Sequence, residues 1–60
     1  MKNEAKILAS RLAFRPEIVE KWMEANSIDS ILDLKDRYPG KEHNECMKLV
    51  ADEIWAFGKA

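Results

Sequence analysis

The sequence predicts an all-α domain, a compact bundle of three short helices followed by a longer C-terminal helix. Apolar residues recur at three- and four-residue spacing in four segments, which is the period of one helix face. The breaks between segments contain residues that interrupt helices, including Pro16, Pro39 and Gly40. Only two glycines and two prolines occur, and 47% of the 60 residues are hydrophobic, which is typical of a folded chain. We expect residues 1–60 to form a single domain.

The first two helices are expected at about 3–12 and 16–25. Asn3 is a favourable N-cap residue for the first helix. Pro16 suits the first position of the second helix, because its missing N–H would be unpaired there in any residue. Glu17 follows in the first turn, where the helix dipole favours a negative charge. The apolar face of the first helix comprises Ala5, Leu8, Ala9 and Leu12, and that of the second Ile18, Val19, Trp22 and Met23.

A short third helix is expected to follow the break at 26–27, with Ser27 as its N-cap, and to end at 38–40. The fourth helix is expected over about 41–57, with Gly58 as the left-handed residue beyond its end. The apolar residues of the third helix are Ile28, Ile31, Leu32 and Leu34. Those of the fourth are Met47, Val50, Ile54 and Phe57, widened by Cys46, Leu49, Ala51 and Trp55.

This apolar surface of the fourth helix is broader than one small three-helix layer requires. Either the helix closes the core, or part of it meets another chain. We expect a homodimer that uses the outer side of the helix. The residues expected in that contact are Leu49, Trp55 and Phe57.

Trp22 is expected at the centre of the core, because the apolar face of the second helix, to which it belongs, meets the apolar faces of the first and third helices.

The residues that could carry chemistry are few. His43 and Cys46 have a spacing that can direct two side chains to one metal ion, but no second Cys or His pair completes a tetrahedral site. With one histidine and no glycine-rich phosphate loop, the sequence predicts no enzyme activity. We expect no metal and no cofactor, with His43 exposed and Cys46 buried.

The charges are unevenly placed, although the net charge is only −1. Residues 1–16 carry four basic side chains and one acidic, whereas residues 17–36 carry six acidic and two basic. Because the net charge is close to zero, the electrostatic field of the whole chain does not steer it toward nucleic acid. A single cysteine cannot form an internal disulfide, and no N-terminal apolar run has the length of a signal sequence or membrane span. These features predict a cytoplasmic protein that does not enter a membrane.

Segment 5–25 carries Ala9, Ala13, Val19 and Trp22 at intervals of four, six and three residues. In this pattern it resembles the helix-turn-helix of phage repressors. There, the small residues let two helices approach and the apolar residues anchor the second helix. The resemblance implies that the second helix enters the major groove of DNA. Its outward positions would be Arg15, Pro16, Glu17, Glu20, Lys21 and Glu24.

The tripeptide 12–14, Leu-Ala-Phe, and the apolar segment 28–34 are similar to the ubiquitin-associated domain. That three-helix module has a Met-Gly-Phe loop between its first two helices. Both resemblances imply a compact three-helix unit with a tight turn at 13–15, followed here by an added helix. A function does not follow from either fold.

Two functions remain open. The acidic charge of the second helix favours a protein-binding module, such as a small phage or bacterial accessory or inhibitor protein, with a partner that has a basic surface. The partner-binding residues would be Glu17, Glu20, Lys21 and Glu24. The helix-turn-helix spacing favours a transcriptional regulator that binds double-stranded DNA through Arg11, Arg15 and Lys21. Three of the six outward positions would place acids beside phosphates, so we prefer the protein partner.

Overall fold

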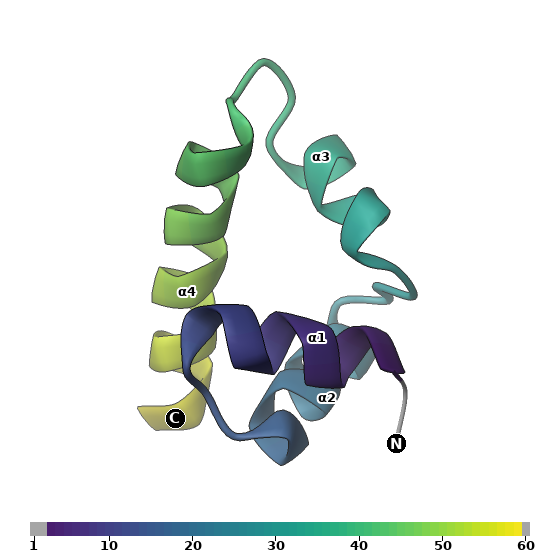
Figure 1. Cartoon of the computed structure of the whole chain (residues 1–60), viewed down its shortest axis with the longest axis vertical. Helices are drawn as coiled ribbons and strands as arrows, with labels where there is room; N and C mark the ends of the chain where they lie inside the picture. The colour runs from purple at the N-terminus through teal and green to yellow at the C-terminus, as the bar shows by residue number, and fades with distance from the viewer. Residues whose placement is uncertain (1–2, 60) are drawn as a thin grey trace.

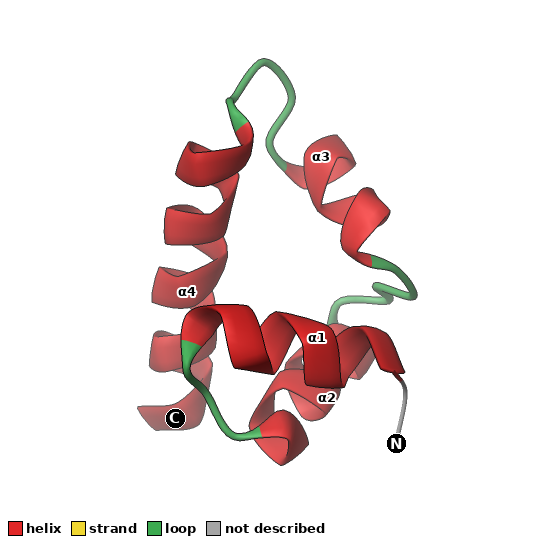
Figure 2. Ribbon diagram, viewed as in Figure 1, coloured by secondary structure: helices red, strands yellow, loops and turns green. Residues whose placement is uncertain are grey.

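Residues 3–59 fold into four α-helices and one short 3-10 helix. The computed structural model describes residues 3–59, and within that range it contains no strand. The elements are α1 (Asn3–Leu12), α2 (Pro16–Ala25), η1 (Ile31–Asp33), α3 (Leu34–Arg37) and α4 (His43–Lys59). In Figure 1, α4 runs along the long axis and α1 lies across the view with α2 behind it. Figure 2 shows that short loops join the helices, which confirms the all-α prediction.

The turn from α1 to α2 is short because one residue reverses the chain. Ala13 adopts a left-handed backbone conformation with φ 60°. The N–H of Phe14 then donates to the carbonyl of Ala9 at 3.0 Å, which closes the end of α1. A left-handed conformation costs a non-glycine residue about 1–2 kcal/mol, which the packing of α1 on α2 must offset.

The end of α2 differs from the expectation that Ser27 begins the next helix. Ser27 has φ 56° and its N–H donates to the carbonyl of Glu24, while the N–H of Ile28 donates to Met23 at 2.8 Å. This pair of bonds is a Schellman motif, in which a left-handed residue ends a helix. The N-cap prediction for Ser27 was therefore wrong, because Ser27 terminates α2.

Ser30 is the N-cap of η1. Its hydroxyl accepts from the N–H of Leu32 at 3.2 Å, and the carboxylate of Asp33 accepts from the N–H of Ser30 at 3.1 Å. This reciprocal capping box satisfies donors that the helix leaves unpaired. In this register Leu34 is buried, whereas Leu32 is 74% exposed. The third segment is thus a 3-10 turn followed by a short α-helix, and Leu32 does not join the core.

The fourth helix extends two residues further than expected. It begins at His43 and Gly58 lies inside its last turn, so the prediction that Gly58 ends the helix was wrong. A Cβ atom on Gly58 would lie 2.5 Å from Cδ1 of Ile18. The glycine therefore provides space for the close approach of α2 to the end of α4.

Trp22 is the largest buried side chain, at 2% exposure. It belongs to an apolar cluster to which α1, α2, α3 and α4 all contribute, and among residues 3–59 no polar or charged residue is buried. The guanidinium of Arg37 lies 5.5 Å from the Trp22 ring centroid and pairs with Glu53 at 2.5 Å, which ties α3 to α4 over the core. The prediction that Trp22 is a core residue is confirmed. Its cluster comprises Ala5, Leu8, Ala9, Val19, Trp22, Met23, Ile28, Leu34, Val50 and Ile54.

Replacing this central side chain should remove most of the stability. We expect Trp22→Ala to cost about 3–5 kcal/mol, because it deletes a buried indole and leaves a cavity. That loss equals the whole stability expected for a domain of this size. Thermal melting followed by circular dichroism should show no cooperative transition. Trp55→Ala is the control, because Trp55 is 59% exposed and its loss should change stability by less than about 1 kcal/mol. A cooperative transition in Trp22→Ala would contradict this account of the core.

A second prediction concerns the hydroxyl of Tyr38. Its oxygen is buried and has no hydrogen-bond partner among residues 3–59. A buried hydroxyl without a partner costs about 1–3 kcal/mol. Tyr38→Phe should therefore leave the free energy of unfolding in urea unchanged or raise it by up to about 1 kcal/mol. For contrast, Ser30→Ala removes the capping hydroxyl and should lower it by about 1 kcal/mol. A clear loss of stability in Tyr38→Phe would show that the hydroxyl has a partner.

Candidate functional site

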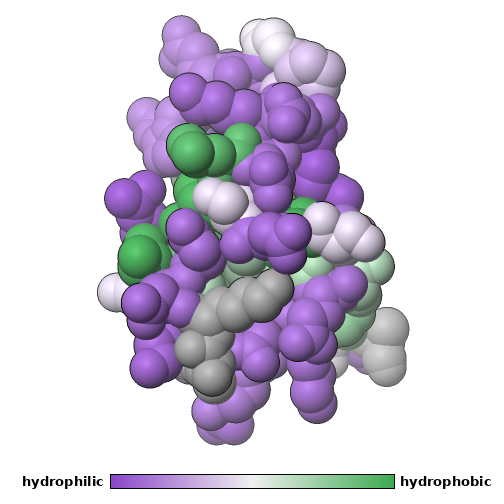
Figure 3. Space-filling model, turned by 90° about the vertical axis from the view of Figure 1, so that its right-hand side faces the viewer, coloured by the Kyte–Doolittle hydropathy of each residue, from purple (hydrophilic) through white to green (hydrophobic). Residues whose placement is uncertain are grey.

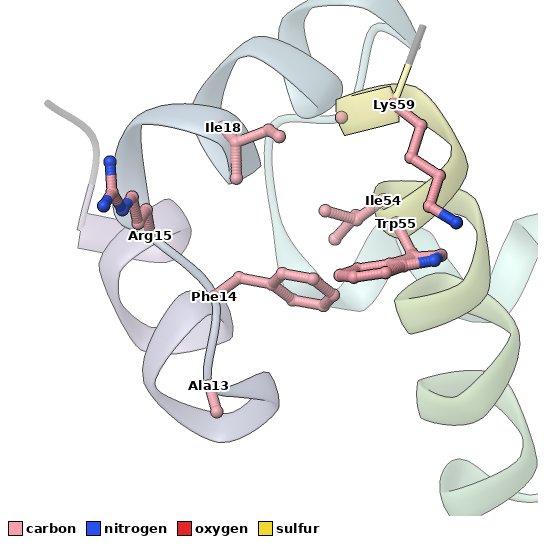
Figure 4. A pocket seen from close by; sticks show the side chains of 8 residues that line it. Ala13, Phe14, Arg15, Ile18, Ile54, Trp55 and Lys59 are labelled. Atoms are coloured by element: carbon pink, nitrogen blue, oxygen red, sulfur yellow. The ribbon is translucent and has the colours of Figure 1, made fainter.

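Two adjoining depressions lie where the 13–15 turn and α2 face the last turns of α4. The first, of about 420 Å³, we call the aromatic pocket. Its lining comprises Ala13, Phe14, Arg15, Ile18, Ile54, Trp55, Gly58 and Lys59 (Figure 4). The second, of about 460 Å³, we call the α2 pocket. It is lined by Arg15, Glu17, Ile18, Lys21, Phe57 and Gly58, so the two pockets share Arg15, Ile18 and Gly58.

The aromatic pocket joins parts of the chain that are far apart in sequence. Figure 4 shows the Phe14 ring extending from the α1–α2 turn toward the Trp55 ring on α4, with Ile18 and Ile54 on one side of the space. Trp55 is 59% exposed and Phe14 is half-buried. An exposed indole with apolar neighbours is unusual for a surface that only meets water.

The charged groups of this pocket are both cationic. The ammonium of Lys59 lies 4.9 Å from the Trp55 ring centroid, within the range of a cation–π interaction. Lys59 follows Trp55 by four residues, so the two side chains are neighbours on one helix face. Arg15 precedes α2 on the opposite rim, and Figure 4 shows its guanidinium directed outward.

The α2 pocket connects the apolar end of α4 to the charged face of α2. Phe57 is 37% exposed at its border, and Glu17 and Lys21 project from α2. The predicted partner-binding residues share this face, because they are three or four positions apart in sequence. Glu17, Lys21 and Glu24 are exposed, and Glu20 is half-buried. Glu17 and Lys21 therefore line the pocket, and Glu20 and Glu24 continue the same face of α2 outside its lining.

The residues predicted for a dimer contact do not form one row. At 3.6 residues per turn, Trp55 and Phe57 point about 160° apart around α4. They border different pockets on the two sides of Gly58. Leu49 is 36% exposed and lines neither of these pockets. A homodimer stays a prediction, and it would use Trp55 or Phe57 rather than all three side chains in one flat contact.

The residues predicted for DNA contacts are only partly brought together. Arg15 and Lys21 both border the α2 pocket. Arg11 is exposed on α1 and lines a third depression, of about 410 Å³, next to Ile7 and Leu32. A single DNA backbone contact would therefore include Arg15 and Lys21 more readily than Arg11.

The third depression contains two exposed apolar side chains, Ile7 and Leu32, of which the sequence pattern had placed Leu32 on an apolar helix face. Leu32 is 74% exposed and Ile7 is 46% exposed. Figure 3 shows the side of the molecule that bears α3, where hydrophobic residues form separate patches among hydrophilic ones. Both signs of charge line this depression, from Glu4, Arg11, Lys35 and His43. This mixture of one acidic and several basic groups does not define a ligand, so we assign no function to this depression.

The His43 and Cys46 pair does not form a ligand set. Cys46 is 2% exposed, and its Sγ lies 3.8 Å from the carbonyl oxygen of Lys41, whereas His43 is exposed. Residues 3–59 contain no cluster of three His, Cys, Asp or Glu side chains that could hold a metal ion. Within the same range no helix combines the length and apolar character needed to cross a bilayer.

Sequence reasoning found Trp55 and Phe57 but missed Phe14, Ile18 and Lys59 as parts of one site. The i, i+4 spacing of Trp55 and Lys59 was a readable signal. No signal in the sequence indicated that Phe14 approaches Trp55, because this approach depends on how α2 packs against α4.

Comparison with known proteins found no match to this chain among protein-family models, curated proteins or solved structures.

Proposed function

We propose that this chain is a small, non-enzymatic protein-binding domain of the accessory or inhibitor type. The observation that carries the proposal is the continuity of the exposed face of α2 with the α2 pocket, where Phe57 and Ile18 supply apolar surface. Protein interfaces commonly combine an apolar centre containing aromatic side chains with a charged and polar rim. This surface has that composition over a small area.

The charge of the α2 face determines the partner's chemistry. Glu17, Glu20 and Glu24 contribute three negative charges and Lys21 one positive charge, so a partner with a basic surface is favoured. Complementary charges at an interface rim mainly raise the association rate and select the partner. The exposed apolar atoms beside them would supply the slow dissociation.

Site-specific photo-crosslinking tests this proposal. A benzophenone amino acid in place of Lys21 should give one discrete protein adduct in lysate of the source cells, because Lys21 lines the α2 pocket and lies one helical turn from Glu17 and Glu24. The same amino acid in place of Lys48, exposed on α4 and outside the α2 pocket, is the control. Changing Glu17, Glu20 and Glu24 together to Gln should weaken the adduct without changing the melting temperature by more than a few degrees. Equal adducts at both positions would contradict the proposal.

DNA binding is the second candidate, and the α1–α2 unit favours it. The short turn with left-handed Ala13 holds two ten-residue helices together, and Arg15 and Lys21 border one exposed edge of the second. The same exposed face carries Glu17 and Glu24, which would repel phosphates. A regulator of this type would therefore depend strongly on its few cations.

The triple change of Glu17, Glu20 and Glu24 to Gln has opposite consequences for the two candidates. If α2 binds DNA, the change removes repulsion and should strengthen binding to a random duplex several-fold in fluorescence anisotropy. Lys21→Ala should then weaken binding and reduce the salt slope by about one. If α2 binds a protein, the unmodified domain should show no micromolar DNA affinity at physiological salt. Micromolar binding that Lys21→Ala abolishes would replace the protein-binding proposal with the regulator.

A further inference from the structure

The aromatic pocket shares Arg15, Ile18 and Gly58 with the α2 pocket, but Phe14, Trp55 and Lys59 belong to the aromatic pocket and give it a different chemistry. We propose that this pocket receives an apolar side chain from an acidic peptide segment of a protein partner. The inference goes beyond the proposed function, because it concerns another pocket and a ligand of the opposite charge. Trp55 lines the aromatic pocket and not the α2 pocket, so its signal reports on this inference separately from the proposed function.

The apolar part of the ligand follows from the pocket lining. Phe14, Ile18, Ile54 and Trp55 surround a space of about 420 Å³. Clefts that hold small ligands measure about 300–1,000 Å³ and are lined mainly by apolar and aromatic side chains. Trp55 leaves 59% of its surface exposed, and burying it under a ligand removes apolar area from water. Tryptophan is among the residues that most often dominate binding energy at interfaces.

The acidic part of the ligand follows from the rim. Among the eight residues that line the pocket, the two charged ones are Arg15 and Lys59, and both are cations. The Lys59 ammonium lies against the Trp55 ring, so a carboxylate beside a bound apolar side chain would lie near it. The guanidinium of Arg15 can pair with a second carboxylate at the opposite rim. Glu17 is the one acidic residue that lines the adjoining α2 pocket, and it does not line the aromatic pocket.

Two other occupants fit these observations less well. A nucleobase could stack on Trp55, but Lys59 covers one face of the indole, and the remaining lining side chains other than Arg15 offer no polar group to a base edge. A second copy of the chain, related by a two-fold axis through the pocket, would bring Arg15 and Lys59 close to their own symmetry mates. An acidic peptide avoids both problems.

The test uses nuclear magnetic resonance of the indole N–H groups. The chain has two tryptophans, and Trp55→Phe assigns their signals. The probes are the peptides acetyl-EEDLFDEE-amide, its basic counterpart acetyl-KKRLFRKK-amide, and acetyl-EEDGSDEE-amide, which lacks the apolar pair. We expect only the first peptide to shift the Trp55 signal saturably, while the Trp22 signal stays in place because that ring is buried.

Charge reversal provides the matched comparison. Changing Arg15→Glu and Lys59→Glu together should weaken binding of the acidic peptide about tenfold, as expected for the loss of two exposed ion pairs. It should also raise the affinity for the basic peptide. Lys48→Glu changes the charge of α4 outside the pocket lining and should leave both affinities within about twofold. Circular dichroism confirms that each variant is folded.

Three results would overturn the proposal. The first is equal binding of the acidic and basic peptides to the unmodified chain. The second is a Trp55 shift caused more strongly by an oligothymidine strand than by the acidic peptide. The third is a dimer in sedimentation at micromolar concentration that Trp55→Ala converts to a monomer, because a second copy would then occupy the pocket. None of these results changes the adduct expected from crosslinking at Lys21, which tests the proposed function of the α2 face.

Discussion

The burial of Trp22 is the interaction on which the rest of the structure depends. A chain of 60 residues buries only about 60% of the surface that its unfolded form exposes, so each large core side chain carries an unusual share of the stability. Trp22 belongs to a cluster that takes side chains from four helices. Arg37 lies near its ring and also pairs with Glu53 of α4, so the indole links the core to the outer contact between α3 and α4.

Two left-handed residues arrange the helices around this core. Ala13 and Ser27 both have positive φ, and neither is a glycine. Each costs about 1–2 kcal/mol in local strain, which tertiary packing must exceed. The residue after each turn gains a buried or half-buried position: Phe14 reaches the aromatic pocket, and Ile28 enters the core at 3% exposure. The two turns therefore position both the hydrophobic core and the candidate site.

The exposed apolar side chains of this domain have two explanations, its small size and a binding function. Trp22 occupies the core, whereas Trp55 and part of Phe57 stay outside it. Scattered exposed apolar side chains are normal in small proteins. The end of α4 differs because Trp55, Phe14 and Ile18 converge on one depression with cations at its rim. This convergence, rather than exposure alone, is what makes the region a candidate interface.

The sequence by itself determined the helices, the central position of Trp22 and the common face of the α2 acids. These features follow from periodicity within one segment, because residues three or four apart share a helix face whatever the tertiary structure. The ends of segments were less well determined. Ser27 and Ser30 are both good N-cap residues, and only the Schellman bonds to Glu24 and Met23 decide between them.

The tertiary structure alone decided the candidate site. Gly58 is a reasonable helix terminator in sequence, yet its missing Cβ accommodates Ile18 inside the last turn of α4. No sequence signal shows that Phe14 and Trp55 line one pocket, because that depends on how closely α2 approaches α4. That approach is a packing property set by side-chain volumes on two helices at once, and a pattern read along one chain segment does not contain it.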